Sequence, residues 1–144
     1  MLSWDPDQNL LNMHNKMASD NFEYSENQTY KSFKRFCKVL DLNDDPELIA
    51  EYIQVHSPGH TWPEIAQGMK EVGILDMEIY ISGNKLFMIM DTVAGFDHDN
   101  AMAELASKPR QKEWEKFVAR FQKTSEDASA EEKWTSVKRI YKMK

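Results

Sequence analysis

Two neighbouring segments of this chain alternate apolar and polar residues in the way that is typical of β-strands. Residues 74–81 read ILDMEIYI, residues 85–93 read KLFMIMDTV, and the intervening SGN at 82–84 is rich in turn formers. This arrangement predicts a β-hairpin with a tight turn. Because a hairpin commits two antiparallel strands to one sheet, it limits the chain to folds that contain an antiparallel sheet.

Other segments carry signals for helices and for two more strands. FCKVLDL at 36–42 reads as a strand, and PELIAEYIQVH at 46–56 reads as an amphipathic helix with Asp45 as its capping acid and Pro46 at its first position. The remaining expected elements are a second helix capped by Thr61 and ending at Gly73, a helical stretch near 100–106, a helix from 109 to about 124, a polar loop at 125–133 and a last strand near 137–143.

This order of elements predicts an α+β fold. Strand, helix, strand, strand, helix, strand is the order of ferredoxin-like domains, in which a four-stranded antiparallel sheet carries its helices on one face. The other face is expected to hold Asp76, Glu78 and Tyr80 from the hairpin. A face that mixes acids, a phenol and apolar groups often lines a ligand cavity or packs on a second sheet, so a homodimer is expected.

The first 33 residues differ in composition from the remainder. They are rich in Asn, Asp, Glu and Ser, and their apolar residues, including Trp4, Leu10 and Leu11, follow no period. We therefore expect residues 1–33 to be a flexible extension and residues 34–144 to form the domain.

Charge and cysteine content limit the partners and the compartment. The 144 residues carry a formal net charge of −6, and no segment shows the basic footprint that a nucleic acid or an anionic membrane would require. No run of 18 apolar residues is present, and the first residues include acids where a signal peptide has a basic start. The single cysteine, Cys37, excludes an internal disulfide. A cytoplasmic protein that binds neither nucleic acid nor membrane is expected.

Tyr52 and His56 are the first candidates for chemistry. Their i, i+4 spacing places a phenol and an imidazole on one face of the helix expected at 46–56. A histidine with a pKa near 6.5 can give or take a proton at neutral pH, so the pair could transfer protons to a small polar ligand. A histidine at a helix end with no catalytic role is the ordinary alternative.

The whole string around this pair resembles the L-rhamnose mutarotase family, small cofactor-free enzymes that interconvert the anomers of a 6-deoxy sugar. The likeness runs from about Phe36 to the C-terminus. It comprises the strand FCKVLDL, the helix ending in EYIQVH, the WPE element with GILDMEIYISGNKLFMIMD behind it, and the late KEWEKF helix.

The resemblance implies a dimer of ferredoxin-like subunits of the dimeric α/β-barrel type. It implies an enzyme that acts on the monosaccharide L-rhamnose, or a relative such as L-fucose, without a metal or another cofactor. His56 would be the general acid or base, Tyr52 its polar companion, and Trp114 would lie against the sugar. From the residues alone, Trp114 fits an apolar core stripe of its helix equally well.

Three further residues are candidates for binding the sugar. Trp62 begins the WPE element, where a structural plug at the helix start is the more ordinary role. Asp76 and Glu78 are acids on the mixed sheet face that could hold sugar hydroxyls. Salt bridges from these acids to Lys38 or Arg139 on neighbouring strands are the alternative.

The chain departs from the family at two places. The loop SPGHT at 57–61 is two residues longer than usual and introduces His60, a further candidate for the site. The helical register from Tyr52 favours His56 over His60 as the catalytic imidazole. Glu115 stands where the family often has a second tryptophan directly after Trp114, so part of the sugar platform could be supplied differently.

Other functions compete with this interpretation. A metal site is a poor fit, because Pro58 and Gly59 separate His56 from His60 and remove helical ligand geometry. A non-catalytic ligand-binding ferredoxin-like dimer is one alternative, and a cofactor-free or haem-handling monooxygenase of the dimeric α/β-barrel kind is another. These share a fold, so the site must separate them.

Overall fold

The structure is a computed structural model that describes Tyr24 and residues 30–144. The chain order of its elements is β1 (Phe33–Asp41), α2 (Pro46–Val55), α3 (Pro63–Glu71), β2 (Ile74–Ser82), β3 (Lys85–Val93), α4 (His98–Ala106), α5 (Gln111–Ala119), α6 (Ala130–Lys133) and β4 (Thr135–Val137). The strands form one sheet in the order β2-β3-β1-β4, and each neighbouring pair is antiparallel. The predicted α+β fold with ferredoxin-like strand order is therefore confirmed.

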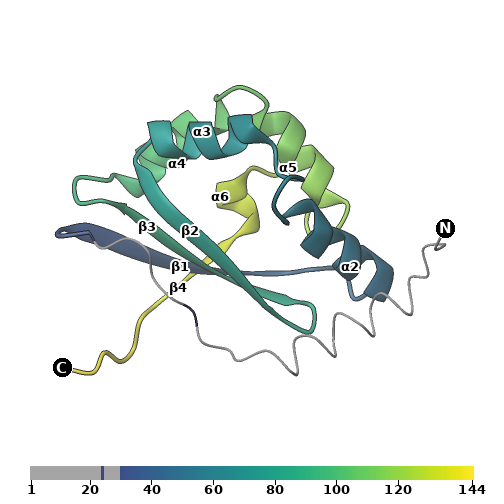
Figure 1. Cartoon of the computed structure of the whole chain (residues 1–144), viewed down its shortest axis with the longest axis horizontal. Coiled ribbons are helices and arrows are strands. Elements are labelled where there is room, and N and C mark those ends of the chain that lie inside the picture. The colour runs from purple at the N-terminus through teal and green to yellow at the C-terminus, as the bar shows by residue number, and fades with distance from the viewer. Residues whose placement is uncertain (1–23, 25–29) are drawn as a thin grey trace.

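The helices cover one face of this sheet. Figure 1 shows α3, α4 and α5 as a layer across the sheet, with α6 between that layer and the strands and α2 near one end. The buried core lies between these layers and includes Leu40, Leu86, Met90 and Phe121.

The hairpin has the predicted turn. Ser82 pairs with Lys85, and Gly83 has a φ of 61°, a left-handed conformation that glycine adopts without steric cost. Asn84 then joins the turn to the end of β1, because its side-chain amide donates to the Leu42 carbonyl at 3.0 Å while the Leu42 amide donates to the Asn84 carbonyl at 2.7 Å. The turn thus fixes both the register of the hairpin and its place beside β1.

Helix α2 begins as its sequence predicts. The Asp45 side chain accepts hydrogen bonds from the backbone amides of Glu47 at 2.9 Å and Leu48 at 3.3 Å, and Pro46 occupies the first turn. The helix ends at Val55, and His56 is its C-cap.

Three other boundaries differ from the predicted ones. Trp62, not Thr61, is the N-cap of α3, and it caps without a side-chain hydrogen bond. Helix α5 begins two residues later than expected, after Arg110 with its left-handed φ of 63°, and it ends at Ala119 instead of near residue 124. The predicted polar loop contains α6, which a capping box between Ser129 and Glu132 stabilises.

The last strand was predicted too late and too long. Strand β4 covers only Thr135–Val137 and pairs with β1 from Cys37 to Val39. The apolar residues that suggested a strand further on are exposed, namely Ile140, Tyr141 and Met143. An alternating pattern becomes a strand only where an edge with free hydrogen-bonding groups is in register with it.

A β-bulge in β2 decides which side chains face the helices. The register against β3 shifts between Ile74 and Asp76, so that two residues of β2 oppose one of β3 there. As a result Ile74 and Met77 both line the helix-covered side, although they are three residues apart.

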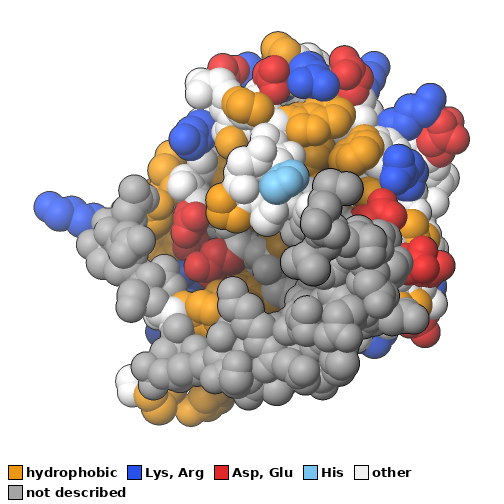
Figure 2. Space-filling model, turned by 45° about the vertical axis from the view of Figure 1, so that its right-hand side comes forward, with side chains coloured by type: hydrophobic (Ala, Val, Ile, Leu, Met, Phe, Trp, Pro, Cys, Tyr) orange, Lys and Arg blue, Asp and Glu red, His pale blue; other side chains and the backbone are white. Residues whose placement is uncertain are grey.

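The predicted extension at 1–33 lies mostly outside the described residues, including Trp4, Leu10 and Leu11. Of its described part, Tyr24 packs its ring edge-on against Tyr80 at 5.7 Å, and the Tyr30 hydroxyl donates to the Leu75 carbonyl at 3.3 Å. No helix in the described part of the chain is long and apolar enough to cross a membrane. On the face that Figure 2 shows, basic and acidic side chains of the described residues are interspersed with hydrophobic ones.

Candidate functional site

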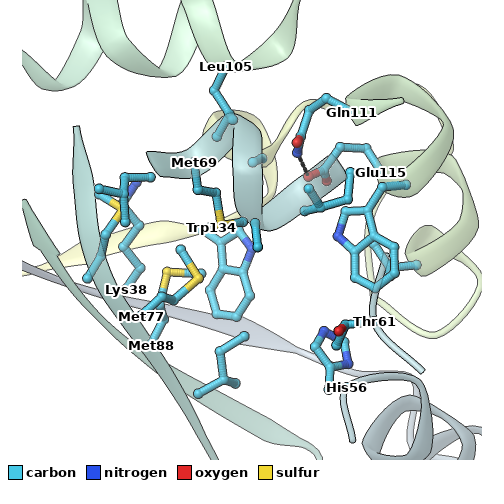
Figure 3. A pocket seen from close by; sticks show the side chains of 18 of the residues that line it. Lys38, His56, Thr61, Met69, Met77, Met88, Leu105, Gln111, Glu115 and Trp134 are labelled. Atoms are coloured by element: carbon cyan, nitrogen blue, oxygen red, sulfur yellow. Dashed lines mark hydrogen bonds between the residues drawn. The ribbon is translucent and has the colours of Figure 1, made fainter. Parts of the chain in front are cut away.

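A cavity of about 470 Å³ lies between the sheet and the helices. Its size is typical of small-molecule sites, which are largely apolar with a few polar groups. Figure 3 shows its walls, to which the sheet contributes Lys38, Met77 and Met88 and the helical side contributes Met69, Gln111 and Glu115. The cavity is thus on the helix-covered face, although Asp76, which was expected on the mixed outer face, also lines it.

The structure brings five of the seven candidate residues to this cavity. His56, Tyr52, Trp114, Trp62 and Asp76 all line it. The other two candidates, Glu78 and His60, are not among its lining residues.

His56 has one of its ring nitrogens committed to the backbone. Nδ1 lies 2.8 Å from the Tyr52 carbonyl oxygen. A carbonyl can only accept, so Nδ1 carries the proton and Nε2 is left with the lone pair. Burial lowers the pKa of His56, and the hydrogen bond to the carbonyl opposes this in part. The imidazole is therefore a neutral base at pH 7.

Tyr52 packs directly against this imidazole and is itself buried. The two ring centroids are 4.3 Å apart. Burial raises the pKa of the Tyr52 phenol well above its usual value, and a hydrogen bond with the Gln122 side chain opposes the shift. The phenol consequently stays protonated at any physiological pH and is a neutral donor.

Trp62 and Trp114 form an aromatic wall beside His56. The Trp114 ring lies 5.5 Å from the His56 ring and 5.2 Å from the Trp62 ring, both edge-on. Trp62 is held by stacking on Phe117 at 5.5 Å and by the Arg110 guanidinium 4.1 Å from its centroid. Trp114 belongs to the buried core and also lines the cavity.

The two sheet acids have different surroundings. Asp76 lies next to the bulge and lines the cavity, and its carboxylate accepts from the Met77 backbone amide at 2.9 Å. Glu78 accepts from the Tyr80 hydroxyl at 2.9 Å. Among the described residues neither acid forms a salt bridge, so the predicted alternative of pairs with Lys38 or Arg139 is wrong.

His60 is tied into the surface loop. The Ser57 hydroxyl donates to the Gln54 carbonyl at 2.6 Å and accepts from His60 Nδ1 at 3.0 Å. Gly59 has a φ of 86° in this turn, and His60 is exposed. His60 therefore lies outside the cavity, whereas Thr61, the last residue of the longer loop, lines it.

Lys38 is a buried cation at the cavity wall, where no pattern in the sequence predicted it. It is 2% exposed, and its amine lies 2.7 Å from His98 Nε2. The other nitrogen of His98 lies 3.0 Å from the Asp99 carboxylate. Burial lowers the pKa of Lys38. His98, Asp99 and Glu131 could also bring ligand atoms together around a metal, but both nitrogens of His98 already have partners.

A second polar group at the cavity wall joins α5 to α6. The Gln111 side-chain amide donates to one oxygen of Glu115 at 2.8 Å, and Lys133 donates to the other at 2.7 Å. The Lys133 side chain is 0% exposed and that of Glu115 is 13% exposed. Gln111, Gln122 and Lys133 were not predicted as site residues. The departure at Glu115 was the one signal in the sequence that pointed here.

Comparisons with known proteins agree with this fold. The sequence model of the family described as L-rhamnose mutarotase matches residues 35–143. The L-fucose mutarotase of Xanthomonas campestris pv. campestris is 39% identical over 110 residues, which cover 76% of this chain and 88% of that protein. A UPF0734 protein of Dictyostelium discoideum is 31% identical over 96 residues, or 66% of this chain and 75% of that protein.

The crystal structure of an L-rhamnose mutarotase from Formosa agariphila has the same fold. It superposes with a TM-score of 0.55 at 21% sequence identity, and the match covers 77% of this chain and 99% of that chain. The resemblance inferred from the WPE element and the Tyr-x-x-x-His helix is confirmed by the family match. The chain belongs to the L-rhamnose mutarotase family.

Proposed function

We propose that this protein is an aldose mutarotase that interconverts the α and β anomers of L-rhamnose or a related 6-deoxy sugar such as L-fucose. The observation that carries this proposal is His56, a neutral imidazole whose Nδ1 is fixed by the Tyr52 carbonyl and which lines a cavity of suitable size. The reaction needs proton transfer and positioning, and this cavity offers groups for both.

The proposed reaction is a reversible ring opening. Nε2 of His56 takes the proton of the anomeric hydroxyl while the bond between the anomeric carbon and the ring oxygen breaks, which gives the open-chain aldehyde. The imidazolium then gives its proton to the former ring oxygen. Both oxygens are bonded to the same carbon in the ring form, so one imidazole can serve both. After the aldehyde carbon turns, the reverse steps close the ring as the other anomer.

The other candidates are assigned to binding. Trp114 would stack on the apolar face of the pyranose, with Trp62 behind it as a support. Tyr52, as a neutral donor, would hydrogen-bond an oxygen near the anomeric centre. Asp76 would accept from a sugar hydroxyl at the edge of the cavity. Glu78 and His60 are given no role in this site, because neither lines the cavity.

Exchange NMR tests the proposal. Micromolar protein added to an equilibrated solution of L-rhamnose or L-fucose should couple the α and β anomeric proton signals without creating a new compound. His56→Ala at the same concentration is the control. Binding of a sugar without faster exchange would support the ligand-binding alternative instead. A haem absorbance band in the purified protein would support the monooxygenase alternative.

The proposed active form is a homodimer that pairs through the outer face of the sheet. No helix of the described residues covers this face, and Phe33, Phe87, Val93 and Val137 are exposed on strands β1, β3 and β4. A second copy would bury these side chains together with exposed apolar residues after β4. A single free cysteine, Cys37 on β1, fits the reducing cytoplasm that we propose as its compartment.

Light scattering after size-exclusion chromatography tests the dimer. The mass should be twice that of one chain at micromolar concentration, and Phe87→Arg should lower it. Gln67→Arg makes the same charge change on helix α3, away from the outer sheet face, and should leave the dimer intact. A wild-type protein that elutes as a monomer would contradict this part of the proposal.

A further inference from the structure

Beyond the acid-base group, two residues of the cavity wall, Gln111 and Gln122, have a buried side-chain oxygen without a partner among the described residues. We propose that the side-chain oxygen of Gln111, held in place by Glu115, recognises one sugar hydroxyl that is distant from the anomeric carbon, which makes Gln111 a specificity-determining residue. This inference rests on the proposed function, because the ligand it assigns is the same sugar.

The burial of Gln111 makes its open oxygen significant. The residue is 2% exposed and lines the cavity. Its amide nitrogen donates to Glu115, but no donor among the described residues lies within hydrogen-bond distance of Oε1. Buried side-chain acceptors in folded proteins almost always have a partner, so an acceptor of this kind at a cavity wall is placed to receive a donor from a ligand.

The orientation of the amide is determined by its neighbours. The Glu115 carboxylate, paired with Lys133 at 2.7 Å, can only accept. If the Gln111 amide were turned over, its oxygen would face a carboxylate oxygen and the hydrogen bond would be replaced by repulsion. Gln111 therefore keeps an unpartnered acceptor at the cavity wall, and the group that we propose it binds must be a donor such as a hydroxyl.

The position of the pair indicates which hydroxyl this is. Figure 3 shows Gln111 and Glu115 at one end of the view and His56 with Thr61 at the other. A sugar whose anomeric carbon lies at His56 would extend the opposite side of its ring toward Gln111. The hydroxyls on that side are those at C3 and C4.

The pair also accounts for the departure from the family at this position. Glu115 stands where a second tryptophan is often found, and in this chain it provides a charged anchor for Gln111 in place of an aromatic surface. A site that hydrogen-bonds a hydroxyl discriminates strongly against an analogue that lacks it, whereas an aromatic surface discriminates weakly. This chain should therefore be more selective at C3 or C4 than a site built on two aromatic rings.

A thermodynamic cycle tests the inference, in which the Gln111 side chain and one sugar hydroxyl are removed separately and together. The substrate is whichever of L-rhamnose or L-fucose the wild type exchanges, together with its 3-deoxy and 4-deoxy analogues. For the wild type, kcat/KM should fall on the order of tenfold to a hundredfold with one of these analogues, as expected for one buried hydrogen bond. Gln111→Leu should lose a similar factor with the parent sugar and lose little more with that same analogue.

Two further proteins make the result decisive. Gln111→Met keeps the length of the side chain without its polar atoms and should behave as Gln111→Leu does. Gln67→Leu is the matched control, because Gln67 donates to Glu71 in the same i, i+4 arrangement on the exposed side of α3 and should leave both sugars unaffected. Melting temperatures of all variants are measured alongside.

The outcomes separate this inference from the proposed function. The factor by which Gln111→Leu lowers kcat/KM could be the same for the parent sugar and for both deoxy analogues. In that case Gln111 binds neither hydroxyl and the inference is wrong. If Gln111→Leu equals Gln67→Leu in both activity and selectivity, the inference is also wrong while the mutarotase proposal stands. If the wild type exchanges no sugar, the proposed function fails and this inference fails with it.

Discussion

The imidazole Nδ1 of His56 lies 2.8 Å from the backbone carbonyl oxygen of Tyr52, one helical turn earlier in the chain. This contact exists because His56 is the C-cap of α2, where the carbonyls of the last turn lack intrahelical partners. One hydrogen bond thus satisfies a helix end and fixes the tautomer of the proposed base. In the proposed reaction, position in the helix, and not a carboxylate among the described residues, prepares this histidine for proton transfer.

The first prediction concerns the two histidines on either side of the insertion. His56→Ala should lower the exchange rate by on the order of 10² to 10⁴, because the proton-transfer group is lost. His60→Ala should keep most of the activity, since its ring bonds only to Ser57 on the surface. Exchange NMR measures both rates, and circular dichroism confirms that both variants are folded. An inactive His60→Ala beside an active His56→Ala would reverse the assignment.

The pH dependence of the rate follows from the burial of His56. Its pKa is lowered, so the imidazole stays neutral and able to act as a base below the reference value of about 6.5. The midpoint of the acid limb of kcat/KM should therefore lie below about pH 6.5. A midpoint above this value would mean that another group, or a charged neighbour, controls the titration.

The same shift has a consequence for stability. The unfolded chain binds a proton at His56 below about pH 6.5, whereas the folded protein binds it only at lower pH. The neutral, buried His56 therefore makes its full contribution to the free energy of unfolding above about pH 6.5. This contribution is lost as the pH falls toward the pKa of His56 in the folded protein. Between pH 7 and 5, the melting temperature of the wild type should fall more than that of His56→Ala.

Tyr52→Phe removes the phenol but keeps the ring. It should slow exchange, because the neutral donor is lost, and it should destabilise the fold by about 1–3 kcal/mol because the buried Gln122 side chain loses its partner. Denaturant unfolding and exchange NMR measure the two effects. An exchange rate equal to that of the wild type would limit Tyr52 to packing against His56.

The ion pair of Lys133 with Glu115 should contribute strongly to folding only as an intact pair. Lys133→Met leaves a buried carboxylate without its cation and should cost about 3–5 kcal/mol of unfolding free energy. Lys116→Met breaks the exposed pair with Glu126 and is the matched control, with an expected cost of at most about 1 kcal/mol. Urea denaturation compares the two. Equal costs would show that burial of the Lys133 pair has no energetic consequence.

The role of the first residues stays a prediction. A chain that begins at Tyr30 keeps the hydrogen bond from Tyr30 to Leu75 and loses the ring contact of Tyr24 with Tyr80. Such an aromatic pair is worth about 0.5–1.5 kcal/mol, so the melting temperature should fall by only a few degrees. A much larger fall would show that the segment before Tyr30 is part of the domain.

The sequence by itself determined the features that depend on neighbours in the chain. The turn at Gly83, the cap at Asp45 and the order of helices and strands along the chain were predicted from the sequence. Each rests on local backbone preference or on a period of two or 3.6 residues. The register from Tyr52 to His56 was predicted for the same reason. Local signals were less reliable where two caps were available, as at Thr61 and Trp62.

Tertiary structure alone decided which face holds the cavity and which polar groups surround it. The bulge beside Asp76 changes the alternation of β2, and the burial of Lys38 depends on His98, sixty residues away in the chain. Likewise, the pairing of Lys133 with Glu115 spans eighteen positions. Such contacts are determined by how the helical layer packs on the sheet, and no periodicity in the sequence records them. His56 was therefore recognisable from the sequence as the candidate for proton transfer, whereas the polar groups that surround the proposed substrate became visible only in the folded chain.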